Sequence, residues 1–215
     1  MYLTLDRLTV PVGSHVLLRQ VSWEAYEDLL QALSQSRASQ IAYDNGDLEI
    51  MTPLPEHEFY KTTLSIAIEE VADSLGIDYA CYGSTTWRRA LEQIGVEPDD
   101  CFYIQNEAIV RGRTDLDLSS DPPPDLVLEI DITSKSLDRF SIYARLGVPE
   151  IWRYENGVLQ AYILTQDTYE ARSTSIAFPG LPVGELVAIV SAQRSAGRRA
   201  MRHAVREWAA QFRAN

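Results

Sequence analysis

Lysine is nearly absent from this sequence: among 215 residues, only Lys61 and Lys135 carry an amine side chain. A mechanism that needs a lysine as a base or as a point charge must therefore use one of these two. A solvated loop is the commonest position for a single lysine. Lys135, however, lies directly beyond an acidic segment, which makes it the stronger functional candidate.

Cysteine is also scarce, with Cys81 and Cys101 present and no Cys-x-x-Cys pair. This spacing excludes a disulfide framework or a cysteine-based zinc site, so we expect two buried thiols in a reducing cytoplasm. No stretch approaches the roughly 18 apolar residues of a membrane span. Residues 1–20 lack the basic-then-apolar order of a secretory signal, so we expect a cytoplasmic protein with no membrane partner.

Positive charge is in deficit, with 19 basic against 31 acidic residues and a formal net charge of −12. Such a balance argues against non-specific binding to nucleic acid. Residues 191–215 are the exception, because they hold six arginines and one acid, a charge of +5 that leaves −17 for the rest. We expect one domain over residues 1–190. A basic helix over residues 191–215 would then pack on that domain or on a partner subunit.

The abundant acids recur in one strand-like stretch, residues 124–135. Its aliphatic members share one parity: Leu126, Leu128, Ile130 and Ile132. The other parity holds Asp125, Val127, Glu129 and Asp131. Successive strand side chains point to opposite faces, so one face meets the core and the other displays three carboxylates. Lined-up acids are favourable around a divalent cation, but they also occur on edge strands that resist aggregation, and the strand alone leaves both interpretations open.

Turn and helix signals surround this strand. Asn45-Gly46 and Asn156-Gly157 each predict a tight hairpin. Ser22 is a typical N-cap for a helix over residues 23–33. Further helices are expected over residues 56–75 and up to Leu146, each followed by a glycine stop. The order strand, helix, strand after residue 124 favours two parallel strands joined by a right-handed crossover.

Four further positions are candidates for function. Pro98-Asp99 opens a strand, so Asp99 stands at a strand mouth where acids of a neighbouring strand can join it. His57 and Lys61 are four residues apart and share one face of the helix over residues 56–75. A helix-capping or surface histidine is the plainer interpretation of His57. Arg88 and Arg89 follow a tryptophan and are candidates for contact with nucleic acid, although a solvated basic face is the default.

Acids at the ends of two adjacent strands are a common way to build a metal site for phosphate chemistry. The ion lowers the pKa of a bound water and neutralises charge that builds in the transition state, while a nearby lysine positions or deprotonates that water. Asp99, Glu129 and Lys135 are the residues that fit these roles.

At these residues the chain resembles the Uma2 (Uma-two) endonuclease family of the PD-(D/E)XK restriction-endonuclease-like superfamily. The similar segments are residues 46–53 with His57, Pro98-Asp99, residues 124–130 and residues 143–152. The resemblance spans roughly residues 22–190. It implies an α/β (α+β) fold in which helices flank a mixed sheet, here with an N-terminal helix and hairpin and a basic C-terminal helix. It also implies that Asp99 and Glu129 ligate Mg²⁺ (Mn²⁺ could substitute), that DNA is cut hydrolytically, and that the protein is a homodimer.

One position departs from the superfamily pattern. The usual lysine would stand two residues after Glu129, where this chain has Asp131. Relatives that lack it carry a lysine near the place of Arg139, but an arginine stays protonated and cannot act as a base. Lys135 is one substitute and Lys61 is a second. Alternatively, Asp131 joins the metal site, or the enzyme is weak or inactive.

Two classes of function therefore stand against each other. The first is a metal-dependent endonuclease acting on DNA. The second is a catalytically inactive nuclease-fold module for binding or assembly. A phosphoesterase acting on a smaller substrate is a third, weaker alternative.

Overall fold

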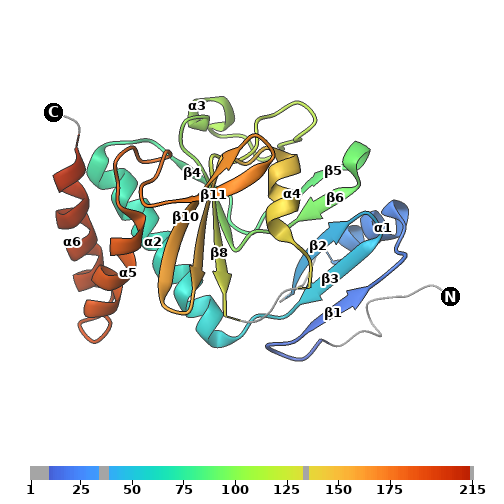
Figure 1. Cartoon of the computed structure of the whole chain (residues 1–215), viewed down its shortest axis with the longest axis horizontal. Helices are drawn as coiled ribbons and strands as arrows, with labels where there is room; N and C mark the ends of the chain where they lie inside the picture. The colour runs from blue at the N-terminus through green and yellow to red at the C-terminus, as the bar shows by residue number, and fades with distance from the viewer. Residues whose placement is uncertain (1–9, 34–38, 133–135, 214–215) are drawn as a thin grey trace.

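The computed structural model of the chain describes residues 10–33, 39–132 and 136–213 (Figure 1). Within them the chain forms two β-sheets and six α-helices, which confirms the expected mixed α+β fold class. Lys135 lies outside the described residues.

The smaller sheet has five strands, and every neighbouring pair is antiparallel. Its spatial order is β1 (His15–Leu18), β3 (Asp47–Met51), β2 (Gln40–Asp44), β6 (Ile94–Val96) and β5 (Trp87–Arg89). The Asn45-Gly46 hairpin between β2 and β3 is confirmed. Both turn residues have positive φ, 46° and 97°, which is the geometry that asparagine and glycine tolerate best.

The larger sheet has six strands and is mixed. Its order is β11 (Thr168–Arg172), β10 (Val158–Thr165), β9 (Glu150–Glu155), β8 (Leu126–Asp131), β7 (Asp100–Tyr103) and β4 (Ala80–Cys81). The pair β8–β9 is parallel, as expected from the crossover, and the other pairs are antiparallel. The Asn156-Gly157 hairpin between β9 and β10 is also confirmed.

The helices are α1 (Trp23–Leu33), α2 (Pro55–Leu75), α3 (Glu107–Val110), α4 (Arg139–Leu146), α5 (Val183–Ala192) and α6 (Arg198–Ala209), with short 3₁₀ turns η2 (Ala90–Glu92) and η3 (Ala210–Phe212). Figure 1 shows α5 and α6 beside α2 at one end of the molecule and the smaller sheet with α1 at the other. None of the described helices is both long and apolar enough to cross a bilayer.

The central strand β8 is buried on both faces. Leu126, Leu128 and Ile130 pack into a core shared with α2, α5 and α6, whereas Val127 packs with Leu146 of α4 on the opposite face. The expected aliphatic face is therefore confirmed, and the acidic face lies under α4 and not in solvent. Glu129 on that face is consequently a buried carboxylate.

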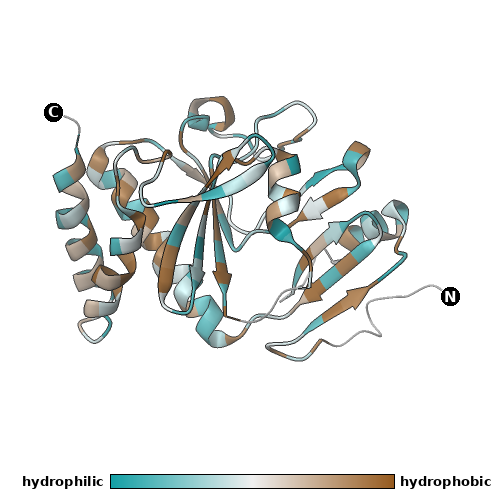
Figure 2. Ribbon diagram, viewed as in Figure 1, coloured by the Kyte–Doolittle hydropathy of each residue, from teal (hydrophilic) through white to brown (hydrophobic). Residues whose placement is uncertain are grey.

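The basic C-terminal segment differs from expectation, because it is not one continuous helix. α5 extends to Ala192, α6 begins at Arg198, and Gly197 between them has a φ of 87°, a conformation that interrupts a right-handed helix. The predicted apolar stripe of α6 is present, with Met201 and Val205 buried. Figure 2 shows hydrophobic and hydrophilic residues interleaved along α6, as expected for a helix with one buried face. α6 packs on α2 of its own chain, and the division of the chain at residue 190 stays a prediction.

Candidate functional site

The strands β7 and β8 bring Asp99 next to Glu129. Their antiparallel register pairs Asp100 with Leu128, so the next step sets Asp99 opposite Glu129. Asp99 is fully buried, and its Oδ2 accepts a hydrogen bond of 2.6 Å from the backbone N–H of Ile130. The two acids expected at neighbouring strand positions thus lie together.

The other oxygen of Asp99 faces side chains from two further elements. The amide of Gln40 on β2 donates a hydrogen bond of 2.6 Å to Oδ1. Nε2 of His57, in the first turn of α2, lies 3.0 Å from the same oxygen. His57 is 2% exposed, so the plainer expectation of a surface histidine is wrong. It is a buried side chain in contact with a candidate acid.

Glu129 is held by α4. It is 1% exposed, and the hydroxyl of Tyr143 donates a short hydrogen bond to its Oε1. Burial, and next the negative charge of Glu129, raise the pKa of Tyr143 well above its usual value. Tyr143 is therefore a neutral donor throughout the physiological range.

Arg139, at the first position of α4, is the cation at the centre of the cluster and is only 4% exposed. Its Nη1 lies 3.4 Å from Glu129 Oε2, and its Nη2 lies 3.5 Å from Glu49 Oε1 on β3. Burial by itself would lower the pKa of Arg139, but the attraction of Glu129, with Tyr143, Asp99 and Glu49 contributing, raises it above its ordinary value. Arg139 is thus a fixed positive charge that joins the two sheets.

Negative charge exceeds positive charge in this cluster. Glu49, Glu97, Asp99 and Glu129 are each at most 1% exposed, whereas Arg139 is the one buried arginine among the described residues. Glu97 accepts bonds from the backbone N–H of Ile41 and the hydroxyl of Thr86, and is accounted for by the fold. Glu49 accepts bonds from two backbone N–H groups just before α4. A surplus of buried carboxylates is costly unless a cation or protons compensate it.

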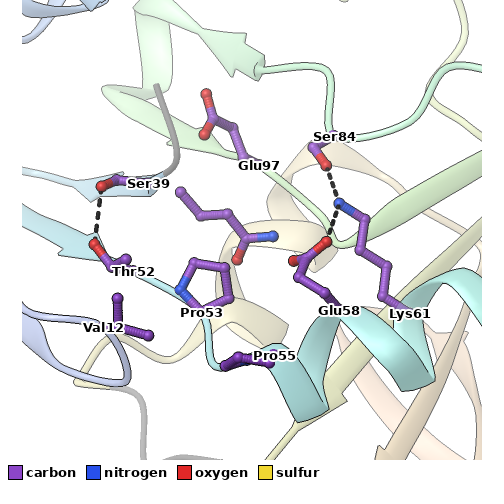
Figure 3. A pocket seen from close by; sticks show the side chains of 10 residues that line it. Val12, Ser39, Thr52, Pro53, Pro55, Glu58, Lys61, Ser84 and Glu97 are labelled. Atoms are coloured by element: carbon purple, nitrogen blue, oxygen red, sulfur yellow. Dashed lines mark hydrogen bonds and ion pairs between the residues drawn. The ribbon is translucent and has the colours of Figure 1, made fainter. Parts of the chain in front are cut away.

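Two clefts reach this cluster. One, of about 680 Å³, is lined by Glu129, Arg139 and Asp131. The other, of about 560 Å³, is lined by Gln40, Glu97 and Lys61 among others (Figure 3). Glu129 is therefore buried but borders space that a substrate can enter, and Asp131 lies at the edge of the same cleft.

Asp131 forms an ion pair with an arginine of the neighbouring strand β9. It is 15% exposed at the side chain, and its Oδ2 is 2.5 Å from Nε of Arg153 on β9. The third expected ligand thus has a cation partner at the rim of the cleft. Lys135 lies outside the described residues, so its distance from Glu129 is not part of this geometry.

Lys61 reaches across the cleft shown in Figure 3. Its Nζ donates a hydrogen bond of 3.0 Å to Ser84 Oγ and lies 3.9 Å from Glu58 Oε2. His57 and Lys61 lie about one turn apart in α2, as the sequence predicts. Lys61 itself contacts neither Asp99 nor Glu129 through any described bond.

Arg88 and Arg89 lie on the edge strand β5, away from the cluster. Arg88 pairs with Glu27 at 3.0 Å and is half exposed. Arg89 donates to the backbone carbonyls of Arg145 and Leu146, at the end of α4. Arg89 is therefore a helix-capping residue, and Arg88 is the freer of the two for contact with a ligand.

Sequence reasoning missed Glu49, Tyr143 and the position of Arg139. A signal for Glu49 was present, because an acid stands between Leu48 and Ile50 in a hairpin strand where acids are disfavoured. Tyr143 follows Arg139 by four residues, hence on one face of α4. Neither signal says which carboxylate each residue meets, since that depends on how the two sheets pack.

The donor chemistry fits a hard divalent cation. Glu49, Asp99 and Glu129 offer carboxylate oxygens, the ligands that Mg²⁺ prefers. As placed, no three acid, histidine or cysteine side chains among the described residues surround one point closely enough to hold an ion. Arg139 and Tyr143 now occupy oxygens of Glu129 that an ion would use. The residues therefore fit in kind, and Arg139 is the competing cation.

One comparison with known proteins bears on this site. The sequence model of the Uma2 family, described as "Putative restriction endonuclease", matches residues 23–191, which are 169 of the 215 residues. The matched stretch contains every member of the cluster and excludes α6. No curated protein matches the chain.

Proposed function

The chain belongs to the Uma2 family, and on that premise we propose that it is a metal-dependent endonuclease that hydrolyses DNA phosphodiester bonds. The observation that carries the proposal is that Asp99, just before β7, lies next to Glu129 of β8, while one buried guanidinium joins Glu129 to Glu49 of β3. Such a cluster has little purpose as a core, because apolar residues of similar volume would be at least as stabilising.

Asp99 and Glu129 are the proposed ligands of Mg²⁺ (or Mn²⁺), with Glu49 beside them. When bound, the ion would supply Lewis-acid activation of a water and neutralisation of charge on the phosphate. Tyr143 fixes the rotamer of Glu129, and the backbone N–H of Ile130 fixes that of Asp99. These contacts orient both carboxylates before any substrate arrives.

Arg139 has a proposed role toward the substrate as well. Its Nη2 forms an ion pair with Glu49 at 3.5 Å, and its Nε has no hydrogen-bond acceptor among the described residues, although the side chain is almost fully buried. A guanidinium with an unused N–H donor at the wall of a cleft is suited to a phosphate oxygen. Arg139 would thus bind the scissile phosphate while it holds Glu129.

Two lysines are the candidates for the general base. Lys135 follows β8 in sequence and is the first candidate, and Lys61 across the other cleft is the second. Asp131 as a third ligand, with no lysine needed, is the alternative. In that case Asp131 would have to leave Arg153.

A catalytically inactive binding or assembly module is the second candidate function. It is favoured by one observation, the cationic Arg139 contacting Glu129 where ion binding would need that carboxylate free. A homodimer in the cytoplasm is proposed for either function, and sedimentation at two protein concentrations tests the dimer.

Isothermal titration of Mn²⁺ into wild type and Glu129→Gln, with plasmid cleavage in the same buffer, tests the proposal. We expect wild type to bind and nick, and Glu129→Gln to lose cleavage by about 10³-fold, as for removal of other electrostatic groups. Glu155→Gln is the matched control, since it makes the same change at an exposed position of the same cleft.

Each other outcome assigns the site differently. Binding without nicking, in any DNA substrate tried, would leave a metal site that serves another phosphate ester. Absence of binding would favour the inactive module.

A further inference from the structure

The arginines of the C-terminal segment fall into two groups. Arg202 and Arg206 form ion pairs with Glu70 of α2, a carboxylate that is 1% exposed, and Arg213 donates to the backbone carbonyl of Ser74. These three arginines anchor α6 to α2. Arg202 and Arg206 compensate the charge of the buried Glu70, as a buried acid requires.

Arg194, Arg198 and Arg199 form the second group. All three are exposed, and none forms an ion pair with any residue that the structure describes. They cluster at the α5–α6 turn. Three of the six arginines of this segment therefore have no described role in packing α6 on α2.

Two of these arginines line a groove of about 400 Å³, the α2–α6 groove, together with residues of α2 and α5. Its lining is Phe59, Tyr60, Thr63, Val190, Ser191, Gln193, Arg194, Gly197, Arg198 and Met201. No acid is among them, in a chain with 31 acidic residues. The groove is thus positively charged, whereas the chain as a whole has a net charge of −12.

The floor of the groove is aromatic. Phe59 is 40% exposed, and the guanidinium of Arg194 lies 5.2 Å from the centre of its ring. Tyr60 beside it is held rigid by stacking on Tyr154, with 4.4 Å between ring centres. An exposed ring flanked by arginines is the chemistry that binds unpaired nucleotides, because bases stack on the ring and phosphates pair with the guanidinium groups.

The groove lies on a different side of α2 from the candidate site. Phe59 follows His57 by two residues, which is about 200° around the helix axis. His57 points inward to Asp99, whereas Phe59 is exposed. The groove is therefore a surface separate from the acidic cluster.

We propose that the α2–α6 groove binds an unpaired segment of DNA, with a base on Phe59 and phosphates on Arg194 and Arg198. A duplex would present phosphates to the arginines but no base face to the ring, which is why the segment is unpaired. The proposal rests on the nuclease function for its choice of DNA, and it concerns residues partly outside the family match. The plainer alternative is a solvated face on which Arg194 merely covers a ring.

Fluorescence anisotropy with a labelled single-stranded oligothymidylate, in chelator and at several salt concentrations, tests the groove without cleavage. We expect Arg194→Gln and Arg198→Gln each to weaken binding and to reduce the salt slope by about 0.7. Phe59→Leu should weaken binding about tenfold, the loss of one stacked base, without a change in slope. Arg172→Gln is the control, since it makes the same charge change on β11, where Arg172 pairs with Glu170.

The outcomes separate the groove from the nuclease. If the groove variants lose binding and wild type never nicks DNA with Mg²⁺, the groove stands and the nuclease function falls. If wild type nicks and the variants bind as wild type does, the groove proposal is overturned alone. Equal losses with duplex DNA, equal losses in Arg172→Gln, or loss of self-association in Arg194→Gln without an oligonucleotide would each overturn it as well.

Discussion

Asp125 directly precedes β8 and Glu129 lies within it, four residues later and with the same parity, yet the two buried acids are held in different ways. Asp125 accepts bonds of 2.7 and 2.9 Å from the backbone N–H groups of Ile104 and Asn106, and one from the side chain of Asn106. Glu129 is held by side chains of α4, the hydroxyl of Tyr143 and the guanidinium of Arg139. Backbone donors are fixed by the fold, whereas side chains can turn away. A buried acid of the second kind is the one that can exchange its partners for a ligand.

We expect the largest effect on stability from substitution of Arg139, the cation that pairs with Glu129. Arg139→Gln leaves Glu49 and Glu129 buried without their guanidinium, which should cost about 3–5 kcal/mol of unfolding free energy in chelator. Mn²⁺ should restore part of this loss, because an ion that binds only the folded state raises the midpoint. Thermal melts of wild type and variant, with and without Mn²⁺, measure the difference.

Arg139→Lys is the matched control, since it keeps the positive charge but loses the planar set of guanidinium N–H donors. A melt in which Mn²⁺ stabilises Arg139→Gln no more than wild type would mean that Arg139 and the ion do not compete for the same oxygens.

Asp125→Asn is expected to have the next largest effect, and on stability alone. Both backbone N–H groups donate to one oxygen, Oδ2, so the amide would keep these bonds and turn its NH2 group toward the side-chain amide of Asn106, which is itself a donor. Loss of that bond should cost about 2 kcal/mol, or roughly 4–8 °C in midpoint for a chain of this size. Chelator and Mn²⁺ should not alter this loss. Cleavage per folded molecule should stay near wild type, in contrast with Glu129→Gln. A Mn²⁺-dependent melt of Asp125→Asn would break the distinction between the two acids.

Asp131→Asn should have the smallest effect. Its partner Arg153 is partly exposed, so loss of the pair is worth about 1 kcal/mol or less. Because Asp131 is held at the rim, we expect cleavage to fall by about tenfold at most. A loss as deep as that of Glu129→Gln in the plasmid assay would instead make Asp131 a ligand, and Arg153→Gln would then be expected to raise metal affinity.

Much of the fold follows from short-range signals. The two Asn-Gly turns, the glycine stops and the alternation of β8 are local, so they predict their elements without knowledge of the rest. The position of Asp99 at a strand mouth is also predicted, but its adjacency to Glu129 depends on the pairing of β7 with β8, which no local signal predicts. The burial of the acidic face is not predicted either, because it depends on α4 covering that side of the sheet.

The contact of Glu49 with Arg139 cannot be predicted from local sequence signals for a related reason. Glu49 meets Arg139 across about ninety positions of sequence, through the packing of one sheet against another. The alternation of residues 124–135 does not distinguish Asp125, Glu129 and Asp131, because all three have the same parity. Only tertiary contacts distinguish Asp125, fixed by a loop, from Glu129, fixed by a helix.

The guanidinium of Arg139 touches both sheets at once: Glu129 on one, and Glu49 and the carbonyl of Glu97 on the other. A ligand that draws Glu129 away therefore loosens a joint between the two halves of the molecule. Coupling free energies are reciprocal, so a partner that clamps the smaller sheet must change the affinity of the acids for their ligand by the same factor. Ligand occupancy of the cluster and the packing of the smaller sheet against the larger sheet should therefore change together.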